Sequence, residues 1–239
     1  MRLQMQPAFL LHRRPFRDSS ELLDLLTLDH GRLAAVARGV ARRRSGGSLA
    51  SLLQPFRPLL ISLSGRGDLL SLAGVEPGGT IAGLHGDALF SGFYLNELVL
   101  RALQRFAPQP SVFLAYGKAV EELGAAETRR DAALVLRRFE FALIDDLGYG
   151  IDFRRTINGD SVYAHASYLL LPGEGLVSVG AGRTAQQPVS GADLLAIADG
   201  HLETVRPAVL RAVARRLLAD HVGPEPLRSA QVFAAASRG

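Results

Sequence analysis

The sequence of 239 residues contains no cysteine, and this absence removes several kinds of site. Without cysteine there is no disulfide bond, no thiolate nucleophile and no cysteine-bound zinc. No apolar run approaches ~18 residues, the length that a membrane-spanning helix needs, and the first residues lack the apolar core of a signal peptide. We therefore expect a soluble protein of the cytoplasm.

Lysine is nearly absent, since Lys118 is the only one and the other 26 basic residues are arginine. A phosphate-binding loop that ends in Gly-Lys-Ser or Gly-Lys-Thr is therefore excluded, and Schiff-base chemistry is limited to Lys118. Arginine offers a planar fork that matches phosphate oxygens and stacks on nucleobases. The basic residues of this chain are thus of the type that suits a nucleic-acid ligand.

The positive charge is concentrated in the first third of the chain. Residues 1–80 hold eleven arginines and six carboxylates, a net charge of +5, whereas the remainder holds sixteen basic and seventeen acidic residues, a net charge of −1. Such an asymmetry favours an N-terminal part that binds nucleic acid or another anionic surface.

One stretch within this part carries four arginines and no carboxylate. An alternating run at 32–38 predicts a half-buried strand, a Ser/Gly segment follows at 45–48, and no acidic residue lies between Asp29 and Asp68. A flexible, solvated loop is one interpretation. A polyanion-binding elbow is the other, and the charge asymmetry leads us to prefer it. Its arginines are Arg38, Arg42, Arg43 and Arg44.

The first 79 residues predict a small β-barrel. Five apolar runs alternate with turn sequences such as Asp29-His30-Gly31 and Gly65-Arg66-Gly67-Asp68, and one longer excursion follows the third run. The second run, 22–28, also fits a helix. Five short strands of this kind suit an OB-type barrel, which binds single-stranded nucleic acid on a basic, partly aromatic face. The candidate DNA-binding residues are Arg13, Arg14, Phe16, Arg38, Arg42, Arg43, Arg44 and Arg57, with Phe16 the best stacking candidate.

Residues 80–239 predict a second, helical domain. Helices are expected at 84–106, from Ser111 as N-cap to Leu123, and from a capping box at Thr128 to Gly148. A Gly-rich segment at about 150–182 predicts a small β insertion with a hairpin turn at Asn158-Gly159-Asp160. Two further helices follow, one capped at Ser190 and one over 207–221. The expected fold class is α+β.

No catalytic constellation stands out in the sequence. The six histidines are scattered without metal-ligand spacing, no Gly-x-Ser-x-Gly elbow occurs, and the adjacent carboxylates at 121–122 and 145–146 diverge on helices. We expect a binding protein without a cofactor rather than an enzyme.

Several of these segments together resemble the RecO family of bacterial recombination mediators and DNA repair proteins. No single segment is diagnostic, but their order and spacing are specific. The segments are Ala8–Pro15, Gly31–Gly39, Leu53–Leu60, Tyr94–Leu98, Leu136–Glu140 with Leu147–Tyr149, and Pro226–Ser229.

The resemblance implies an N-terminal OB fold followed by a helical domain with a small insertion. It also implies binding of single- and double-stranded DNA, annealing of complementary strands, and cooperation with RecR in loading the recombinase RecA onto strands coated by single-stranded-DNA-binding protein. That coating protein has an acidic tail with a terminal phenylalanine, whose capture requires arginine and an apolar pocket. The family match makes Arg137, and after it Arg138, the candidates for this contact.

This chain departs from the family at one point. Several family members hold zinc with four cysteines in the insertion, but here Thr156 stands where the first would be and the others are missing. Zinc is therefore not expected, and the insertion must be held by strand pairing and packing. An alternative to the mediator is a protein-binding adaptor whose basic barrel docks an acidic protein surface rather than DNA.

Overall fold

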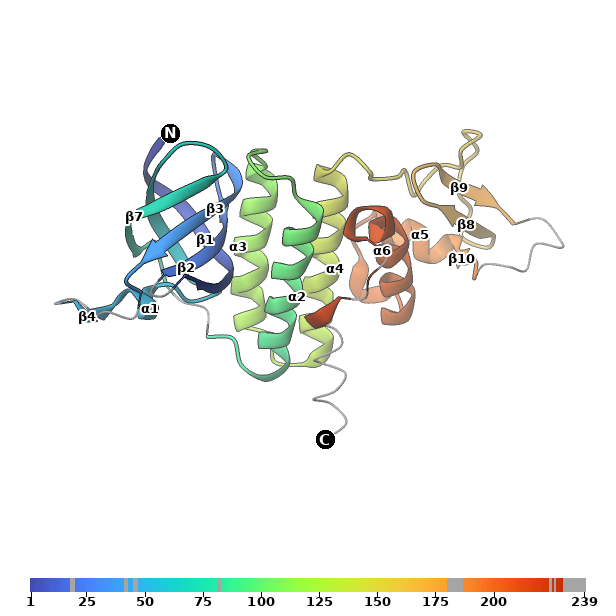
Figure 1. Ribbon diagram of the computed structural model, residues 1–239. Helices are drawn as coiled ribbons and strands as arrows, with labels where there is room; N and C mark the ends of the chain where they lie inside the picture. Colours follow the sequence, from blue (N-terminus) through green and yellow to red (C-terminus); the bar gives the residue numbers. More distant parts are fainter. Residues whose placement is uncertain are drawn as a thin grey trace. The chain divides into compact units, whose positions relative to one another are not determined.

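The computed structural model describes residues 1–17, 20–40, 43–44, 47–80, 83–179, 187–223, 225 and 227–229, with only the backbone described at 43–44 and 47–48. It confirms the expected α+β fold, an N-terminal five-stranded closed barrel followed by a helical region with a small extra sheet (Figure 1). The run at 22–28 that fitted either a helix or a strand is a strand.

The barrel is closed in the order β1-β2-β3-β7-β6. All neighbours are antiparallel except β3 and β7, which pair in parallel over three residues. The excursion between β3 and β6 contains the short strands β4 and β5 and one helical turn, α1. The bounds are β1 Arg2–Phe16, β2 Ser20–Thr27, β3 Gly31–Arg38, β4 Arg43–Arg44, β5 Gly47–Ser48, α1 Leu49–Leu52, β6 Pro58–Ser64 and β7 Leu69–Pro77.

Side chains alternate between the interior and the outer face of this barrel, as the two-residue period of strands requires. Leu23 and Leu25 of β2 and Leu33 of β3 are fully buried in the interior cluster. Leu22, Leu26 and Ala34 are also buried, although they lie on the outer face. Part of the outer face must therefore be covered by something other than the barrel.

Two helices, α2 (Gly86–Ala102) and α3 (Pro110–Gly124), lie beside the barrel and supply this cover (Figure 1). The ring of Phe9 on β1 packs against Phe113 and Tyr116 of α3, with centroids 5.2 and 4.9 Å apart. The predicted N-cap at Ser111 is wrong, because α3 begins at Pro110 and Gln109 is the cap residue. Proline is well suited to this first position, since it needs no partner for an N–H.

A buried hydrogen-bond pair joins these helices to a β-bulge in β1. The register between β1 and β2 shifts between Leu10 and His12, so Leu11 is the extra residue. The side-chain amide of Asn96 donates to the Leu11 carbonyl oxygen (2.8 Å), and the Tyr116 hydroxyl donates to Asn96 Oδ1 (2.6 Å). Burial raises the pKa of Tyr116, so its hydroxyl stays a donor. A buried amide with both ends bonded fixes the bulge in place.

The second compact unit, Thr128–Glu225, contains the remaining helices and a three-stranded sheet of order β10-β8-β9. The capping box at Thr128 and the side-chain cap at Ser190 are both confirmed. The bounds are α4 Arg129–Asp146, β8 Ser167–Leu171, β9 Gly175–Ser178, β10 Val189–Ser190, α5 Gly191–Ala198, η1 Leu202–Thr204 and α6 Pro207–Val222.

The β insertion begins with a tight turn rather than the expected strand. Residues 151–157 form only isolated bridges, in which Arg155 pairs with Ser161 and Thr156 with Leu176. Thr156 is buried, its amide donates to the Asp160 carbonyl oxygen (2.9 Å), and its hydroxyl accepts from the Asp160 amide (3.2 Å). This side chain therefore closes the turn. A threonine used in this way does not fit a metal site, and the described residues contain no cluster of three or more metal-ligating side chains.

The first compact unit contains the barrel, α2 and α3 as Met1–Glu127, together with Pro226–Gly239. Its two parts are joined through Glu97 of α2. The carboxylate of Glu97 accepts from the backbone amides of Arg228 (3.0 Å) and Ser229 (2.9 Å) and from the Ser229 hydroxyl (2.7 Å). Although burial acts to raise it, the pKa of Glu97 is lowered by these hydrogen bonds and by Arg101.

Replacing Glu97 with glutamine is expected to destabilise the first unit at pH 7 by about 2 kcal/mol, because two or more hydrogen bonds to a charged acceptor are weakened. A lowered folded-state pKa adds stability above the ordinary value of 4.5, and that stability is lost as the pH falls through the lowered pKa. Urea unfolding of both proteins at pH 7 and pH 3 measures this difference. If the two proteins differ in free energy of unfolding by the same amount at pH 3 and pH 7, the charged Glu97 carboxylate is not the source of the stability.

Candidate nucleic-acid interface

The pairing register of β1, β2 and β3 brings several of the predicted DNA-binding residues together. Phe16 pairs with Ser20, and Ser20 pairs with Arg38, so these three residues form one row across the strands. Arg14 heads the next row, with Leu22 opposite it. Directly paired residues project from the same face of a sheet. Both rows lie on the outer face, because Ala37, which lies between them, and Leu23, which lies beside the second row, belong to the interior cluster.

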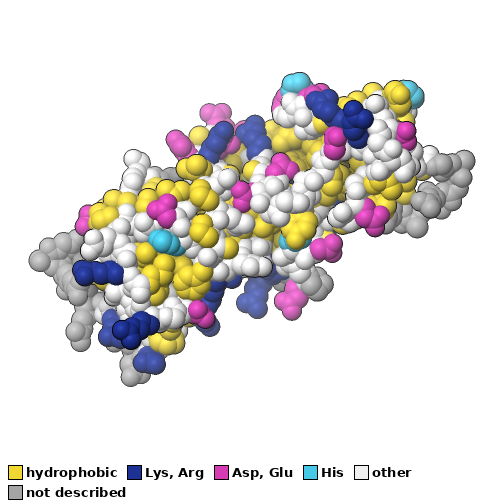
Figure 2. Space-filling model, turned by 90° about the horizontal axis from the view of Figure 1, so that it is seen from above, with side chains coloured by type: hydrophobic (Ala, Val, Ile, Leu, Met, Phe, Trp, Pro, Cys, Tyr) yellow, Lys and Arg dark blue, Asp and Glu magenta, His cyan; other side chains and the backbone are white. Residues whose placement is uncertain are grey.

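This part of the outer face, which we call the open strip, consists of Arg14, Phe16, Arg17, Ser20 and Arg38. Its three arginines are exposed, and Phe16 is half-buried. Among the described residues, neither Arg14 nor Arg38 forms an ion pair. Figure 2 shows several basic side chains lying close together at the barrel end of the face in view. Within the part of the chain that the structure describes, the open strip therefore combines two arginines without an ion pair, Arg14 and Arg38, with one half-buried aromatic ring.

Arg17 was missed at the sequence level, and it completes the stacking position. Its guanidinium carbon lies over the Phe16 ring, 5.1 Å from the centroid. Arg17 has φ of 55°, a left-handed conformation that is uncommon outside glycine. The adjacent Phe-Arg pair was visible in the sequence, but the backbone angle that places one side chain over the other was not.

Two predicted residues lie apart from the open strip. Arg13 pairs with Leu23, which places it on the inward side at the end of the barrel, and its guanidinium lies 3.6 Å from the carboxylate of Glu21. Arg57 is half-buried and donates to the Ser51 carbonyl oxygen of α1 (2.9 Å). The cation of Arg13 is partly neutralised, and Arg57 fastens α1 to the start of β6.

The elbow arginines are only partly covered by the structure. Arg42 lies outside the described residues, and for Arg43 and Arg44 only the backbone is described. Arg43 pairs with Ser48 and Arg44 with Gly47, so β4 and β5 form a two-residue antiparallel pair. The expected role of these three side chains stays a prediction.

A partly exposed group of charged residues, Arg32, Arg105 and Asp24, lies on the side of the barrel that faces the helices. Arg32 donates to the Leu100 carbonyl oxygen near the end of α2, and the Phe106 amide donates to the Arg32 carbonyl oxygen (3.0 Å). Burial, together with the nearby charge of Arg105, lowers the pKa of Arg32, and Asp24 opposes this shift. The side chain and the backbone carbonyl of Arg32 thus join β3 to the helical part of the first unit.

The predicted contacts for an acidic tail, Arg137 and Arg138, lie on α4 and differ in environment. Arg137 donates to Glu140 Oε1 (2.6 Å), and the two side chains are 12% and 1% exposed. Arg138 is exposed. The two arginines therefore differ in exposure: Arg138 is exposed, and Arg137 lies against a buried carboxylate.

A closed five-stranded barrel followed by a helical region is the architecture of an OB-type domain with an attached helical part. No helix of the described residues is long and apolar enough to span a bilayer. Comparison with known families gives two matches, Recombination protein O N terminal over residues 1–80 and Recombination protein O C terminal over residues 84–230.

Curated relatives agree over nearly the whole length. The chain is 40% identical to the DNA repair protein RecO of Halorhodospira halophila over 234 residues, which cover 96% of each protein. It is 41% identical to the protein of the same name from Pseudomonas putida strain GB-1, with 95% of this chain and 96% of the relative covered. For Methylococcus capsulatus the identity is 38%, with 99% and 95% covered. The chain belongs to the RecO family of DNA repair proteins.

Replacing Arg137 with alanine is expected to destabilise the second unit by about 3 kcal/mol, because it removes the guanidinium that neutralises the buried Glu140 carboxylate. Replacing the exposed Arg138 should cost less than about 1 kcal/mol. Thermal or urea unfolding of both variants provides the comparison. Equal losses in the two variants would show that the Arg137–Glu140 pair does not stabilise α4.

Proposed function

We propose that this chain is a non-catalytic, DNA-binding recombination mediator. The single observation that carries the proposal is the open strip, where Arg17 lies over the half-buried ring of Phe16, and Arg14 and Arg38 share its face without a carboxylate partner among the described residues. Membership in a family of DNA repair proteins supports DNA as the ligand of this surface. Single- and double-stranded DNA share the phosphate backbone that such cations bind.

On this proposal a single strand lies across the rows of β1, β2 and β3. The guanidinium groups contact its phosphates, and a base stacks on Phe16 in place of the Arg17 guanidinium, an arrangement that tolerates any sequence because every base has a π-face. Neutralised phosphates repel a complementary strand less strongly. The protein would thus promote annealing by electrostatics and positioning, without bond making.

We propose separate sites for the DNA and for the protein partner. The barrel binds DNA, and α4 binds the acidic tail of single-stranded-DNA-binding protein. Arg137 and Arg138 remain the proposed contacts, with Arg138 offering the exposed guanidinium and Arg137 held in place by Glu140. Together with RecR, the protein would help to load RecA onto strands that the coating protein occupies.

Replacing Arg14 and Arg38 with alanine should weaken binding of an oligothymidylate and flatten its salt dependence. Each phosphate contact on a single strand contributes about 0.7 to the slope of log K against log salt, so the double variant should lose about 1.4. Fluorescence anisotropy over a salt series measures the slope. Adding alanine at Arg42, Arg43 and Arg44 should flatten it further if the elbow takes part.

Arg13→Ala provides the matched control, because this neighbouring arginine faces Glu21 across 3.6 Å. It should change the slope by less than Arg14→Ala does. Salt-insensitive binding, or a slope unchanged by the double variant, would rule out the open strip as the DNA site.

The alternative function is an adaptor whose barrel docks an acidic protein surface. The cations of the open strip favour any polyanion, so the alternative deserves a direct test. An oligothymidylate and an acidic peptide ending in phenylalanine should bind independently if DNA occupies the barrel and the peptide occupies α4. Competition for one site, abolished by Arg14→Ala and Arg38→Ala, would support the adaptor.

A further inference from the structure

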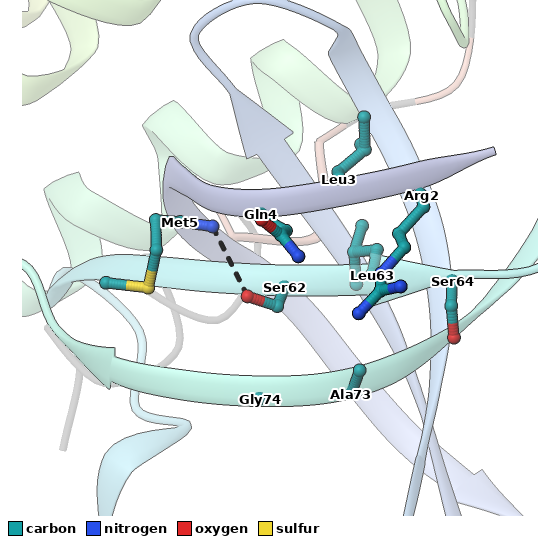
Figure 3. Close-up of a pocket in the computed structure, with 9 residues that line it drawn as sticks. All are labelled: Arg2, Leu3, Gln4, Met5, Ser62, Leu63, Ser64, Ala73 and Gly74. Atoms are coloured by element: carbon teal, nitrogen blue, oxygen red, sulfur yellow. Dashed lines mark hydrogen bonds between the residues drawn. The ribbon is translucent and has the colours of Figure 1, made fainter.

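A second candidate site lies on the outer face of the barrel where β1, β6 and β7 meet (Figure 3). The register of β1 against β6 shifts between Leu3 and Gln6, and that of β7 against β6 shifts beside Ser62 and Leu63. Two irregularities thus flank the same point of β6. A cavity of about 260 Å³ opens there, lined by Arg2, Leu3, Gln4, Met5, Ser62, Leu63, Ser64, Ala73 and Gly74.

The bulge in β1 holds a methionine in an unfavourable conformation. Met5 has φ of 50°, and its amide donates to Ser62 Oγ (3.3 Å). The residue is 45% exposed, so a ligand could reach its thioether. Bulges often redirect a side chain next to a functional site, and backbone strain of this kind concentrates at such sites.

The lining groups suit a planar, hydrogen-bonding ring with an attached anion. Figure 3 shows Arg2 reaching from β1 across β6, with Gln4 between Arg2 and Met5. The lining offers a guanidinium, an amide and the hydroxyls of Ser62 and Ser64, and it contains no carboxylate. A thioether makes favourable contacts with aromatic rings. The cavity is smaller than the ~300 Å³ at which drug-sized sites begin, so it has room for one ring system.

We propose that this cavity binds one nucleotide of single-stranded DNA, with the base against Met5 and the phosphate at Arg2. The inference rests on the proposed function and extends it, because this cavity involves strands other than the β2 and β3 rows of the open strip. A bound base explains the exposed thioether, and its polar edge is matched by Gln4 and Ser64. An acidic peptide would use Arg2 but leave these neutral groups without a role.

The test uses the fact that the chain has only two methionines. Methyl-¹³C-methionine labelling of the full chain gives two signals, and Met5→Leu assigns them. Titration with oligothymidylate should shift the Met5 signal upfield through the ring current of the base. Arg2→Ala should abolish this shift and reduce the salt slope of binding by about 0.7. Arg66→Ala, which removes an exposed cation outside the cavity lining, should leave the shift intact.

The outcomes separate the two proposals. If the full chain fails to bind oligothymidylate at low salt in an anisotropy assay, the proposed function fails and the cavity assignment with it. If the oligonucleotide binds but the Met5 signal stays unmoved, only the cavity assignment is overturned. A Met5 shift caused by an acidic phenylalanine-ended peptide and not by the oligonucleotide would also overturn the nucleotide assignment.

Discussion

The hydrogen bond from Asn96 to the Leu11 carbonyl oxygen is the contact on which the proposed DNA surface depends. Leu11 is the extra residue of a bulge, and an extra residue exchanges the inward and outward sides of every position that follows it. Because of this bulge, Arg14 and Phe16 project outward and Arg13 projects inward. The Tyr116 hydroxyl donates to the other end of the Asn96 amide. Residues of α2 and α3 thus hold the bulge that sets which side chains of β1 face outward.

The same helices divide the outer face of the barrel by charge and burial. Where α2 and α3 pack, the outer face contains buried apolar residues such as Phe9 and Leu26. Beyond them, Arg14 and Arg38 remain exposed, without ion pairs among the described residues. Other arginines have partners within the fold, such as Arg32 of β3, which donates to the Leu100 carbonyl oxygen near the end of α2. The proposed polyanion surface therefore depends on what the helices cover as well as on where arginine occurs.

Sequence patterns predicted the five strands, the capping box at Thr128 and the cap at Ser190, because each depends on residues close in the chain. They did not predict that Arg13 and Arg14 face opposite sides of the barrel wall. That difference follows from a bulge held by Asn96, which is distant in the sequence, and no local pattern indicates it. They also gave no sign of the positive φ that turns Arg17 over Phe16. The pairing of Arg137 with Glu140 has ordinary helical spacing, but its burial comes from packing within the second unit.

The absence of cysteine permits a direct measurement of which side chains face the ligand. Single cysteines placed at 13, 14 and 16 of the full chain can be labelled with a thiol reagent, with and without oligothymidylate. The bulge predicts rapid labelling at 14 and 16 that the oligonucleotide suppresses, and slower labelling at 13 that it leaves nearly unchanged. Protection at 13 with none at 14 or 16 would contradict the account.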